Sequence, residues 1–315
     1  NLFTYFIYLS ALSLSMFFLY LLKNSIKNFF QFLIGISPII YISTLKGFVG
    51  TDSENYYKFF ERINTDLTIY LSFISSWEFL EPLYFILNYT IKYLNLPFSF
   101  LLFSVSILNW TLFFLVIRKY EFKSYQFVFV AVTIGYLFFT FNGVRQSISI
   151  AFMFYSIIFF LDKKYFGFIF FYIVSILFHF SSIIFLPFIL LSSNIKLKFD
   201  WMLFLFLIFL FLPSNFFYYL VGLIVKNLGF YTSYYQTIIN SNSELITFGV
   251  LLNILIWSIS FIYFYPLYNT RFNVLIYNMS FIGLLFYVMF YSNPIINRIV
   301  IVFYYFILFK YLLIF

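Results

Sequence analysis

The stretch FSFLLFSVSILNWTLFFLVI (residues 98–117) holds no charged residue and is long enough to cross a bilayer as one helix. Runs of the same apolar character fill most of the chain and are separated by polar breaks. The other predicted spans are 2–22, 29–48, 125–141, 146–161, 165–178, 180–193, 201–213, 247–265, 273–291 and 299–315. We therefore predict an all-α fold, a polytopic membrane bundle of about 11 transmembrane helices (about 10 to 12) with short helices on the outer side. The whole chain, 1–315, is expected to form a single domain.

The composition of the chain supports the same fold class. Hydrophobic residues make up 64% of the 315 residues and charged residues 9%, whereas a soluble domain has roughly 45–50% apolar and about 25% charged residues. The absence of Cys excludes thiolate metal sites, and the single His excludes a multi-histidine metal site. The sequence also lacks a GxxxxGK run and a GxGxxG turn, the usual signs of nucleotide binding. We therefore expect a membrane protein that uses no metal and no cofactor.

The positions of the charged residues predict how the bundle is oriented. Cytoplasmic loops of membrane proteins carry an excess of Lys and Arg. The basic groups between predicted spans are Lys23 and Lys27; Arg118, Lys119 and Lys123; Lys163 and Lys164; Lys196 and Lys198; and Arg271. If all of them face the cytoplasm together with Lys310 near the end of the chain, the inner side holds 11 basic and 3 acidic residues, and the outer side is neutral. The N-terminus then lies outside and the C-terminus inside, provided that 82–95 re-enters or lies at the interface instead of crossing.

Two segments on the predicted outer side are long enough to build a functional site. Residues 46–81 carry most of the acidic groups, and residues 214–246 are rich in Tyr and Asn. Because no inner loop is comparable in length, we expect the chemistry on the outer face. Nucleic acid is not an expected partner, because the basic residues are scattered in twos and threes and form no dense patch for a phosphate backbone.

Polar residues lie on one face at the start of the predicted helix 146–161. Asn142, Arg145, Gln146 and Ser149 follow the spacing i, i+3, i+4 and i+7, which is one face of a helix. These side chains must face protein or water, because a bare polar group in lipid costs several kcal/mol.

Two further polar residues lie close to the same predicted level. His179 lies at the outer turn between 165–178 and 180–193, and Arg298 lies where the last span begins. Together with Arg145 they are expected to converge on one anion, because a planar guanidinium pairs bidentately with phosphate oxygens. Plainer interpretations stay open: the arginines are anchors that snorkel to the headgroups, and His179 is a structural group at a helix junction.

The order of several short motifs resembles that of a known family. The motifs are GTDSENYYKFF (50–60), WEFLEPLYFILN (77–88), NGVRQSISIAF (142–152), LFHFSSIIFLP (177–187) and NRIVIVFYYF (297–306). In this order they resemble the EpsG/Wzy-type polysaccharide polymerases of bacterial surface glycans. The most specific part is the Arg-Gln pair that opens an apolar helix, together with the later Phe-His. The chain departs from the family where Gly50-Thr51-Asp52-Ser53 stands in place of an Asp followed directly by Tyr.

The resemblance implies a membrane glycosyltransferase with a GT-C-like bundle in the bacterial cytoplasmic membrane, with its active site facing outward. Such enzymes use oligosaccharide repeat units on undecaprenyl pyrophosphate as both donor and acceptor. They transfer the growing glycan to the next lipid-linked unit and release undecaprenyl pyrophosphate. A chain-length regulator protein and the bilayer itself are the other partners that the resemblance implies.

The chemistry of such a transfer assigns roles to the candidate residues. The leaving pyrophosphate gains negative charge in the transition state, and preorganised cations there accelerate the reaction. The expected substrate- and pyrophosphate-binding residues are Arg145, Arg298, Gln146, Asn142 and Tyr56. The acceptor hydroxyl needs a base or an orienting group, for which His179, Asp52 and Glu81 are equal candidates.

Three other functions remain as alternatives to a polymerase. A ligase related to the O-antigen ligases uses the same chemistry but a different acceptor. A lipid-linked glycan transporter or flippase would line a path across the membrane with charges, and it commonly shows inverted repeats, which this sequence lacks. A structural membrane scaffold would give no reason to place arginines on helix faces.

Overall fold

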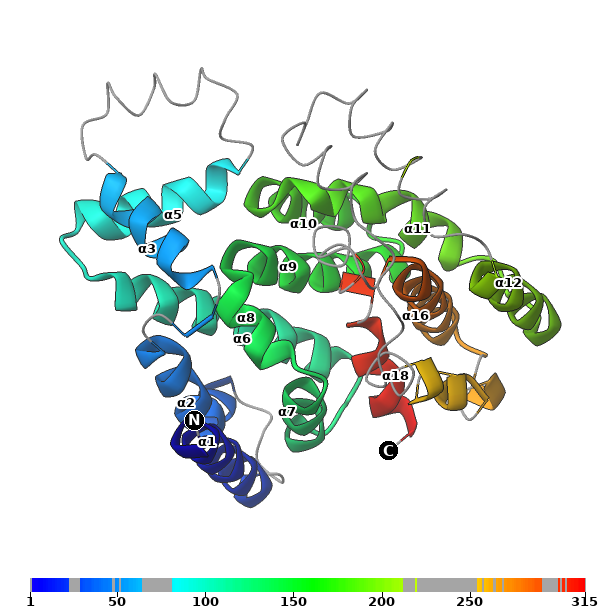
Figure 1. The fold of residues 1–315 in the computed structure, drawn as a ribbon, viewed down its shortest axis with the longest axis horizontal. Coiled ribbons are helices and arrows are strands. Elements are labelled where there is room, and N and C mark those ends of the chain that lie inside the picture. Colours follow the sequence, from blue (N-terminus) through cyan, green and yellow to red (C-terminus); the bar gives the residue numbers. More distant parts are fainter. Residues whose placement is uncertain are drawn as a thin grey trace. The chain divides into compact units, whose positions relative to one another are not determined.

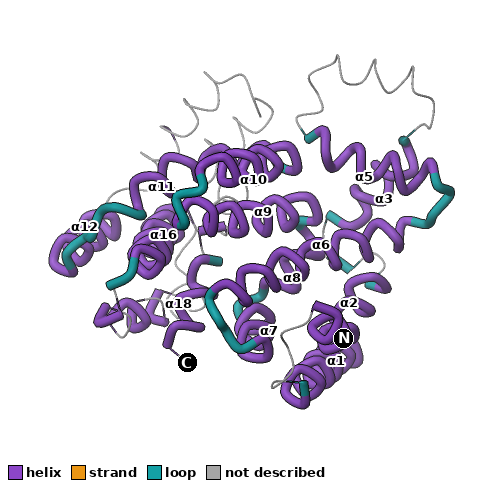
Figure 2. Tube along the Cα trace, turned by 180° about the vertical axis from the view of Figure 1, so that it is seen from behind, coloured by secondary structure: helices purple, strands orange, loops and turns teal. Residues whose placement is uncertain are grey.

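The computed structural model consists of helices and connecting turns, and its described residues contain no strand (Figures 1 and 2). The structure describes residues 2–22, 29–46, 49–50, 52–63, 81–211, 219, 254–256, 258–262, 265–267, 269–290, 300, 302–303 and 305–314. The chain divides into two compact units, residues 1–185 and 186–315. The expectation of a single domain stays a prediction.

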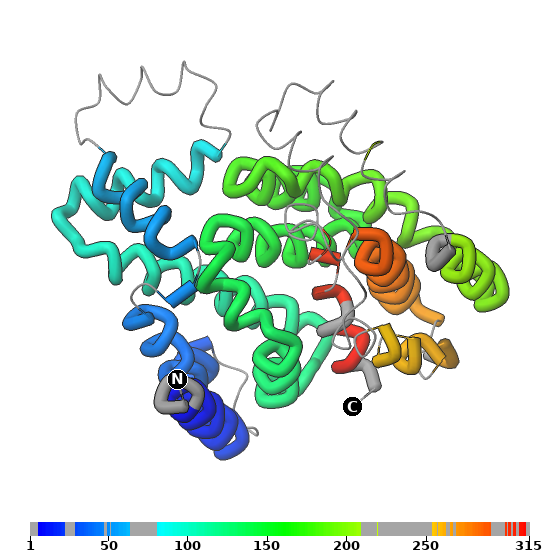
Figure 3. The backbone as a smooth tube through the Cα atoms, viewed as in Figure 1, coloured from blue at the N-terminus to red at the C-terminus, as the bar shows by residue number. Residues whose placement is uncertain are grey.

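The first unit is built around α9. Its helices are α1 (Leu2–Leu21), α2 (Phe29–Leu45), α3 (Ser53–Arg62), α5 (Pro82–Tyr93), α6 (Phe98–Lys119), α7 (Ser124–Thr133), α8 (Tyr136–Asn142), α9 (Val144–Leu161) and α10 (Tyr165–Phe178), followed by the 3-10 turn η1 (Phe180–Ile184). Helix α9 packs most extensively against α10 and next against α6, while α2 packs against α1 and α6. In both the ribbon and the tube views α9 lies between α10 on one side and α6 and α8 on the other. Figure 3 shows the same helices coloured by their order along the chain.

Sharp turns join the helices that pack together. Lys163, with φ of 60°, reverses the chain between α9 and α10, and the preceding Asp162 pairs with Lys119 at the end of α6 (2.7 Å). The end of α6, the end of α9 and the start of α10 therefore lie close together. The predicted run 125–141 is not one straight helix: α7 and α8 meet at an angle of 59°. The cause is Gly135, whose left-handed φ of 83° ends α7 as a helix C-terminal glycine commonly does.

Three described helices are long and apolar enough to cross a membrane, namely α6, α9 and α16 (Arg271–Phe290), and the bent pair α7–α8 meets the same criterion when taken together. Helix α5 has 12 residues, so it is about 18 Å long and too short for a hydrocarbon core of about 30 Å. This length agrees with the expectation that 82–95 does not cross. The count of 11 spans and the GT-C-like arrangement stay predictions, since the runs 247–265 and 299–315 are described only in part.

The second unit contains α11 (Phe185–Ser192), α12 (Phe199–Phe211), α16 and α18 (Phe306–Ile314), with a 3-10 turn at Tyr265–Leu267. Helix α16 packs against α12 and α18. Gly283 of α16 permits a close approach, because a Cβ there would lie 2.7 Å from Cβ of Phe303. The buried Asn278 donates from Nδ2 to the carbonyls of Ser192 (2.8 Å) and Ile195 (2.6 Å), which satisfies backbone acceptors at the end of α11.

Candidate functional site

Glu81 is the centre of a cluster built from three separate segments of the first unit. It lies immediately before α5, and its side chain is 9% exposed. Arg145 in the first turn of α9 donates from Nη1 to Glu81 Oε2 (2.5 Å). His179 Nδ1 hydrogen-bonds the other carboxylate oxygen, Oε1. One buried carboxylate thus holds a guanidinium on one oxygen and an imidazole on the other.

The backbone around each residue explains how the three side chains meet. Pro82 occupies the first position of α5, where its fixed φ suits the start of a helix, so Glu81 lies in the turn outside it. Gly143 separates α8 from α9 and lets the chain turn just before Arg145. His179 is extended (φ −157°, ψ 110°) and ends α10, yet its N–H donates to the Ser175 carbonyl (3.1 Å). The imidazole therefore projects from a helix end whose backbone is held.

A buried network of serines fixes α9 against the segment that carries His179. Ser149 Oγ donates to the Ser175 carbonyl (2.8 Å) and is hydrogen-bonded to the hydroxyls of Ser175 (2.9 Å) and Ser182. Tyr172 donates to the Ser182 carbonyl (2.5 Å). Ser149, one member of the predicted polar stripe, therefore faces protein and sets the spacing between α9, α10 and η1.

Hydrogen bonds and a neighbouring positive charge keep Glu81 ionised despite its burial. Burial alone would raise the pKa of Glu81, but the hydrogen bond from His179 and the positive charge of Arg145, which also donates a hydrogen bond, lower that pKa. The Arg145 guanidinium lies 5.9 Å from the centre of the Tyr56 ring, a cation–π distance. Burial raises the pKa of Tyr56, so this phenol stays protonated. An ionised Glu81 with a lowered pKa is a weak proton acceptor.

A buried cation, Lys46, lies where the Gly50–Ser53 turn meets α8. The helix of the predicted span 29–48 ends at Leu45, so Lys46 lies just beyond α2. Lys46 is 7% exposed and donates from Nζ to the Phe141 carbonyl (2.6 Å) and Ser53 Oγ (3.4 Å). Gly50 has φ of 113°, and a Cβ there would lie 2.7 Å from Asn142 Oδ1. The early sequence motif is therefore docked on the end of α8, directly before Arg145 and its helix.

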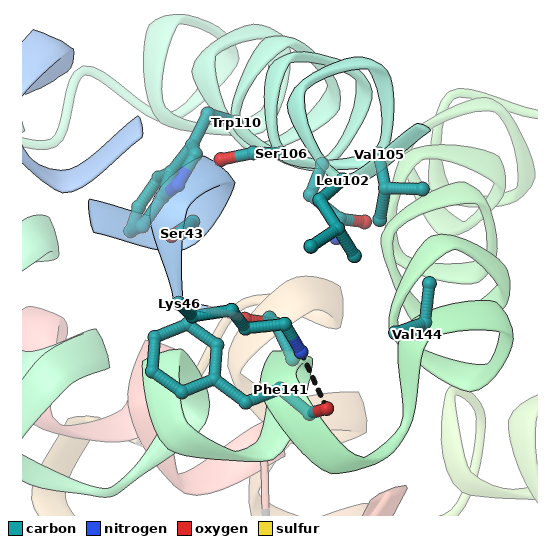
Figure 4. Close-up of a pocket in the computed structure, with 10 residues that line it drawn as sticks. Ser43, Lys46, Leu102, Val105, Ser106, Trp110, Phe141 and Val144 are labelled. Atoms are coloured by element: carbon teal, nitrogen blue, oxygen red, sulfur yellow. Dashed lines mark hydrogen bonds between the residues drawn. The ribbon is translucent and has the colours of Figure 1, made fainter. Parts of the chain in front are cut away.

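The Lys46 side chain borders a small cavity between α2, α6 and the α8–α9 junction (Figure 4). Its volume of about 20 Å³ suits a single water molecule. Ser106 Oγ and Asn109 Oδ1 line it, and neither atom has a hydrogen-bond partner among the described residues. The lining is mostly apolar, with a few polar side chains, and the volume is too small for a sugar or a phosphate.

A model of the EpsG family matches residues 30–315, which is most of the sequence. The chain belongs to the EpsG family. No curated protein and no solved structure matches it. Membership of the EpsG family, together with the apolar helices, indicates a multi-pass membrane protein with a general role in polysaccharide polymerisation.

Within this EpsG-family chain, the predicted site residues have different surroundings. Arg145, His179 and Glu81 are in direct contact, and Tyr56 lies beside Arg145. Arg298 lies outside the described residues, so its convergence with Arg145 stays a prediction. The segment 214–246 lies outside them as well, apart from Tyr219.

The remaining candidates lie around the cluster. Asp52 precedes α3 without a side-chain cap bond, and its charge raises the pKa of Tyr56, so it is a neighbour of that ring. Asn142 lies against the Gly50 turn, and Gln146 is buried on α9 next to Arg145. The described residues contain no group of three or more His, Cys, Asp or Glu that could hold a metal ion. The sequence analysis did not single out Lys46, although a lysine near the end of the apolar run 29–48, just before the Gly50 motif, is a usable signal.

Proposed function

We propose that this EpsG-family chain is a membrane glycosyltransferase that polymerises undecaprenyl-pyrophosphate-linked oligosaccharide repeat units on the outer face of the bacterial cytoplasmic membrane. The observation that carries the proposal is the contact of Glu81 with both Arg145 and His179. Each residue comes from a different motif of the sequence. A cation, an oriented imidazole and a buried carboxylate are the groups that transfer from a glycosyl pyrophosphate needs.

The proposed reaction assigns each proton and electron pair. The acceptor hydroxyl oxygen attacks the anomeric carbon of the donor glycan, while the bond from that carbon to the pyrophosphate oxygen breaks. The bonding electrons leave with undecaprenyl pyrophosphate. The hydroxyl proton passes to His179 Nε2. No nucleotide is consumed, because the donor is already activated.

Glu81 decides which nitrogen of His179 takes that proton. Because the ionised carboxylate accepts a hydrogen bond from Nδ1–H, the neutral imidazole keeps its lone pair on Nε2. The same carboxylate stabilises the imidazolium that forms after proton transfer, as an Asp does for His in hydrolytic triads. Of the three candidate bases, His179 with Glu81 as its orienting partner is therefore the best supported.

Arg145 suits the leaving group. Its Nη1 is bound to Glu81, but the side chain is 45% exposed, and a guanidinium has five N–H donors. The remaining donors suit the oxygens of a pyrophosphate, and the ion pair with Glu81 fixes the plane of the guanidinium.

The proposal is tested in a host whose own copy of this gene is deleted. Arg145→Ala should insert at normal levels but leave surface glycans of a single repeat unit, whereas Lys119→Ala, which breaks a different ion pair, should give the normal ladder of chain lengths. A normal ladder from Arg145→Ala would overturn the site. Purified protein supplied only with lipid-linked repeat units should elongate them, which a ligase or a flippase does not do.

A further inference from the structure

An open groove lies at the far end of α5 from Glu81 on the first unit. It has a volume of about 510 Å³ and is bordered by the end of α3, the end of α5 and the turn that leads into α6. The side chains that matter here are Tyr57, Phe98, Glu61, Lys92, Asn95 and Ser99. The groove is much larger than the cavity beside Lys46 and opens to the outside of the unit.

The lining combines aromatic faces with a fixed polar rim. The rings of Tyr57 and Phe98 meet edge to face with centres 5.5 Å apart, and Tyr57 is 36% exposed. Lys92 Nζ donates to the backbone carbonyls of Phe60 (3.0 Å) and Glu61 (2.6 Å) and also pairs with the Glu61 carboxylate (3.5 Å). Sugars present C–H faces that suit aromatic rings and hydroxyls that both donate and accept, so this lining matches a glycan.

The charge of the rim favours an uncharged ligand. Lys92 already faces the Glu61 carboxylate and two carbonyls, so its charge is largely satisfied within the protein. A phosphate would find no additional charge to neutralise at this lysine. Carboxylate and amide groups at Glu61 and Asn95 are instead the usual partners of sugar hydroxyls.

The two helices that border the groove, α3 and α5, also have residues at the Glu81–Arg145–His179 cluster. Tyr57 follows Tyr56, whose ring lies beside Arg145. Lys92 lies in the last turn of α5, and Glu81 lies immediately before its first turn. Eleven residues of helix at about 1.5 Å each separate the two by about 16 Å, the length of a short oligosaccharide.

We propose that this groove binds the sugar residues of the lipid-linked substrate that lie beyond the reacting ring. This assignment rests on the proposed function and adds a glycan subsite about one α5 length from the reacting atoms. The subsite sets the position of the repeat unit without taking part in bond making or breaking. Its residues should therefore affect substrate binding more than turnover.

The test measures binding without catalysis. The probe is the free repeat-unit oligosaccharide, released by mild acid from the host's own lipid-linked pool and titrated onto the full protein in nanodiscs. Tyr57→Ala should weaken binding about tenfold, and Tyr57→Phe should change it little, because the ring provides the contact. Asn95→Gly removes the amide while keeping the left-handed backbone (φ 55°), and should weaken binding severalfold. Tyr93→Ala, a 63% exposed tyrosine of α5 that does not line the groove, is the matched control.

Elongation assays separate the two proposals. Tyr57→Ala should raise KM for the lipid-linked unit while kcat stays near that of the unmodified protein, whereas Arg145→Ala should lose turnover. If Arg145→Ala abolishes elongation but Tyr57→Ala and Asn95→Gly bind the oligosaccharide normally, the groove assignment is overturned and the polymerase stands. If Tyr57→Ala weakens binding of sugar-free undecaprenyl phosphate instead, the groove holds a lipid headgroup and the assignment is wrong. Normal elongation by Arg145→Ala would reject the proposed function itself.

Discussion

Replacing Lys46 by methionine should remove a pH dependence from the stability of the protein. Lys46 is 7% exposed, and burial lowers its pKa from 10.5 to about 7. Between these values the unfolded chain binds more protons than the folded chain, so stability must rise as the pH rises through this window. Below pH 7 Lys46 is protonated in both states, so the folded state bears the full free-energy cost of burying its charge.

The magnitude follows from the two pKa values. A full unit of pKa difference corresponds to about 1.4 kcal/mol, so the free energy of unfolding should increase by about 2 kcal/mol between pH 7 and pH 9. Methionine keeps an apolar stem of similar length and removes the charge. The Phe141 carbonyl keeps a contact with Ser53 Oγ (3.2 Å), although this hydroxyl shares its one proton with the nearer Val49 carbonyl (2.7 Å). Below pH 7 the Lys46→Met protein should therefore be the more stable of the two.

The assay is denaturant unfolding in detergent micelles at pH 7, 8 and 9, followed by circular dichroism. The quantity compared is the difference between the unmodified and Lys46→Met proteins, because tyrosines that titrate at high pH are common to both. Lys58→Met, at a side chain that is 55% exposed, is the control and should leave the pH dependence intact. Equal slopes in the unmodified and Lys46→Met proteins would refute the reasoning, because they would mean that Lys46 is protonated equally in both states.

Three further substitutions test the contacts around the cluster. Ser149→Ala should lower the free energy of unfolding by about 1–3 kcal/mol in the same denaturant assay, since it removes hydrogen bonds between α9, α10 and η1. The control Ser156→Ala loses only a local hydrogen bond within α9 and should lower the free energy of unfolding clearly less. Glu81→Gln should reduce kcat at least about tenfold in the elongation assay, with little change in KM. The amide keeps an acceptor for His179 but loses the charge that stabilises the imidazolium. An unchanged kcat would contradict the orienting role of Glu81. Gly50→Ala should destabilise the protein by about 1–3 kcal/mol in the same unfolding assay, because φ of 113° is strained for alanine and its Cβ would meet Asn142. An unfolding curve identical to that of the unmodified protein would show that the turn adapts.

Much of the helical layout could be predicted from the sequence because charged residues bound the apolar runs. Helices α6, α9 and α10 begin and end within two residues of the predicted runs 98–117, 146–161 and 165–178. The hydrophobic pattern is local, and so is the information needed to place these ends. The bend at Gly135 was missed because the apolar character continues through it, and only the backbone conformation of one glycine interrupts the helix.

The candidate site could be predicted as a set of residues but not as a set of contacts. Arg145 and His179 stand out because a charge and an imidazole are rare in apolar surroundings. Their meeting point is Glu81, which is 64 residues from Arg145 and 98 from His179 along the chain. No spacing rule joins residues so far apart, because their proximity depends on how α5, α9 and α10 pack. For the same reason the sequence left Glu81, His179 and Asp52 as equal candidate bases, whereas the contacts distinguish them.

The charge of the cluster argues for another cation at the site. Ionised Glu81 cancels the charge of Arg145, so the pair together is neutral. A departing pyrophosphate carries more negative charge than one already paired guanidinium can offset, even when His179 is protonated by the acceptor hydroxyl. Lys46 is not that cation, because it is enclosed at the α2–α8 junction and bound to a carbonyl. Arg298, whose Asn-Arg motif was predicted to lie at the same outer level, therefore stays the expected second partner of the leaving group.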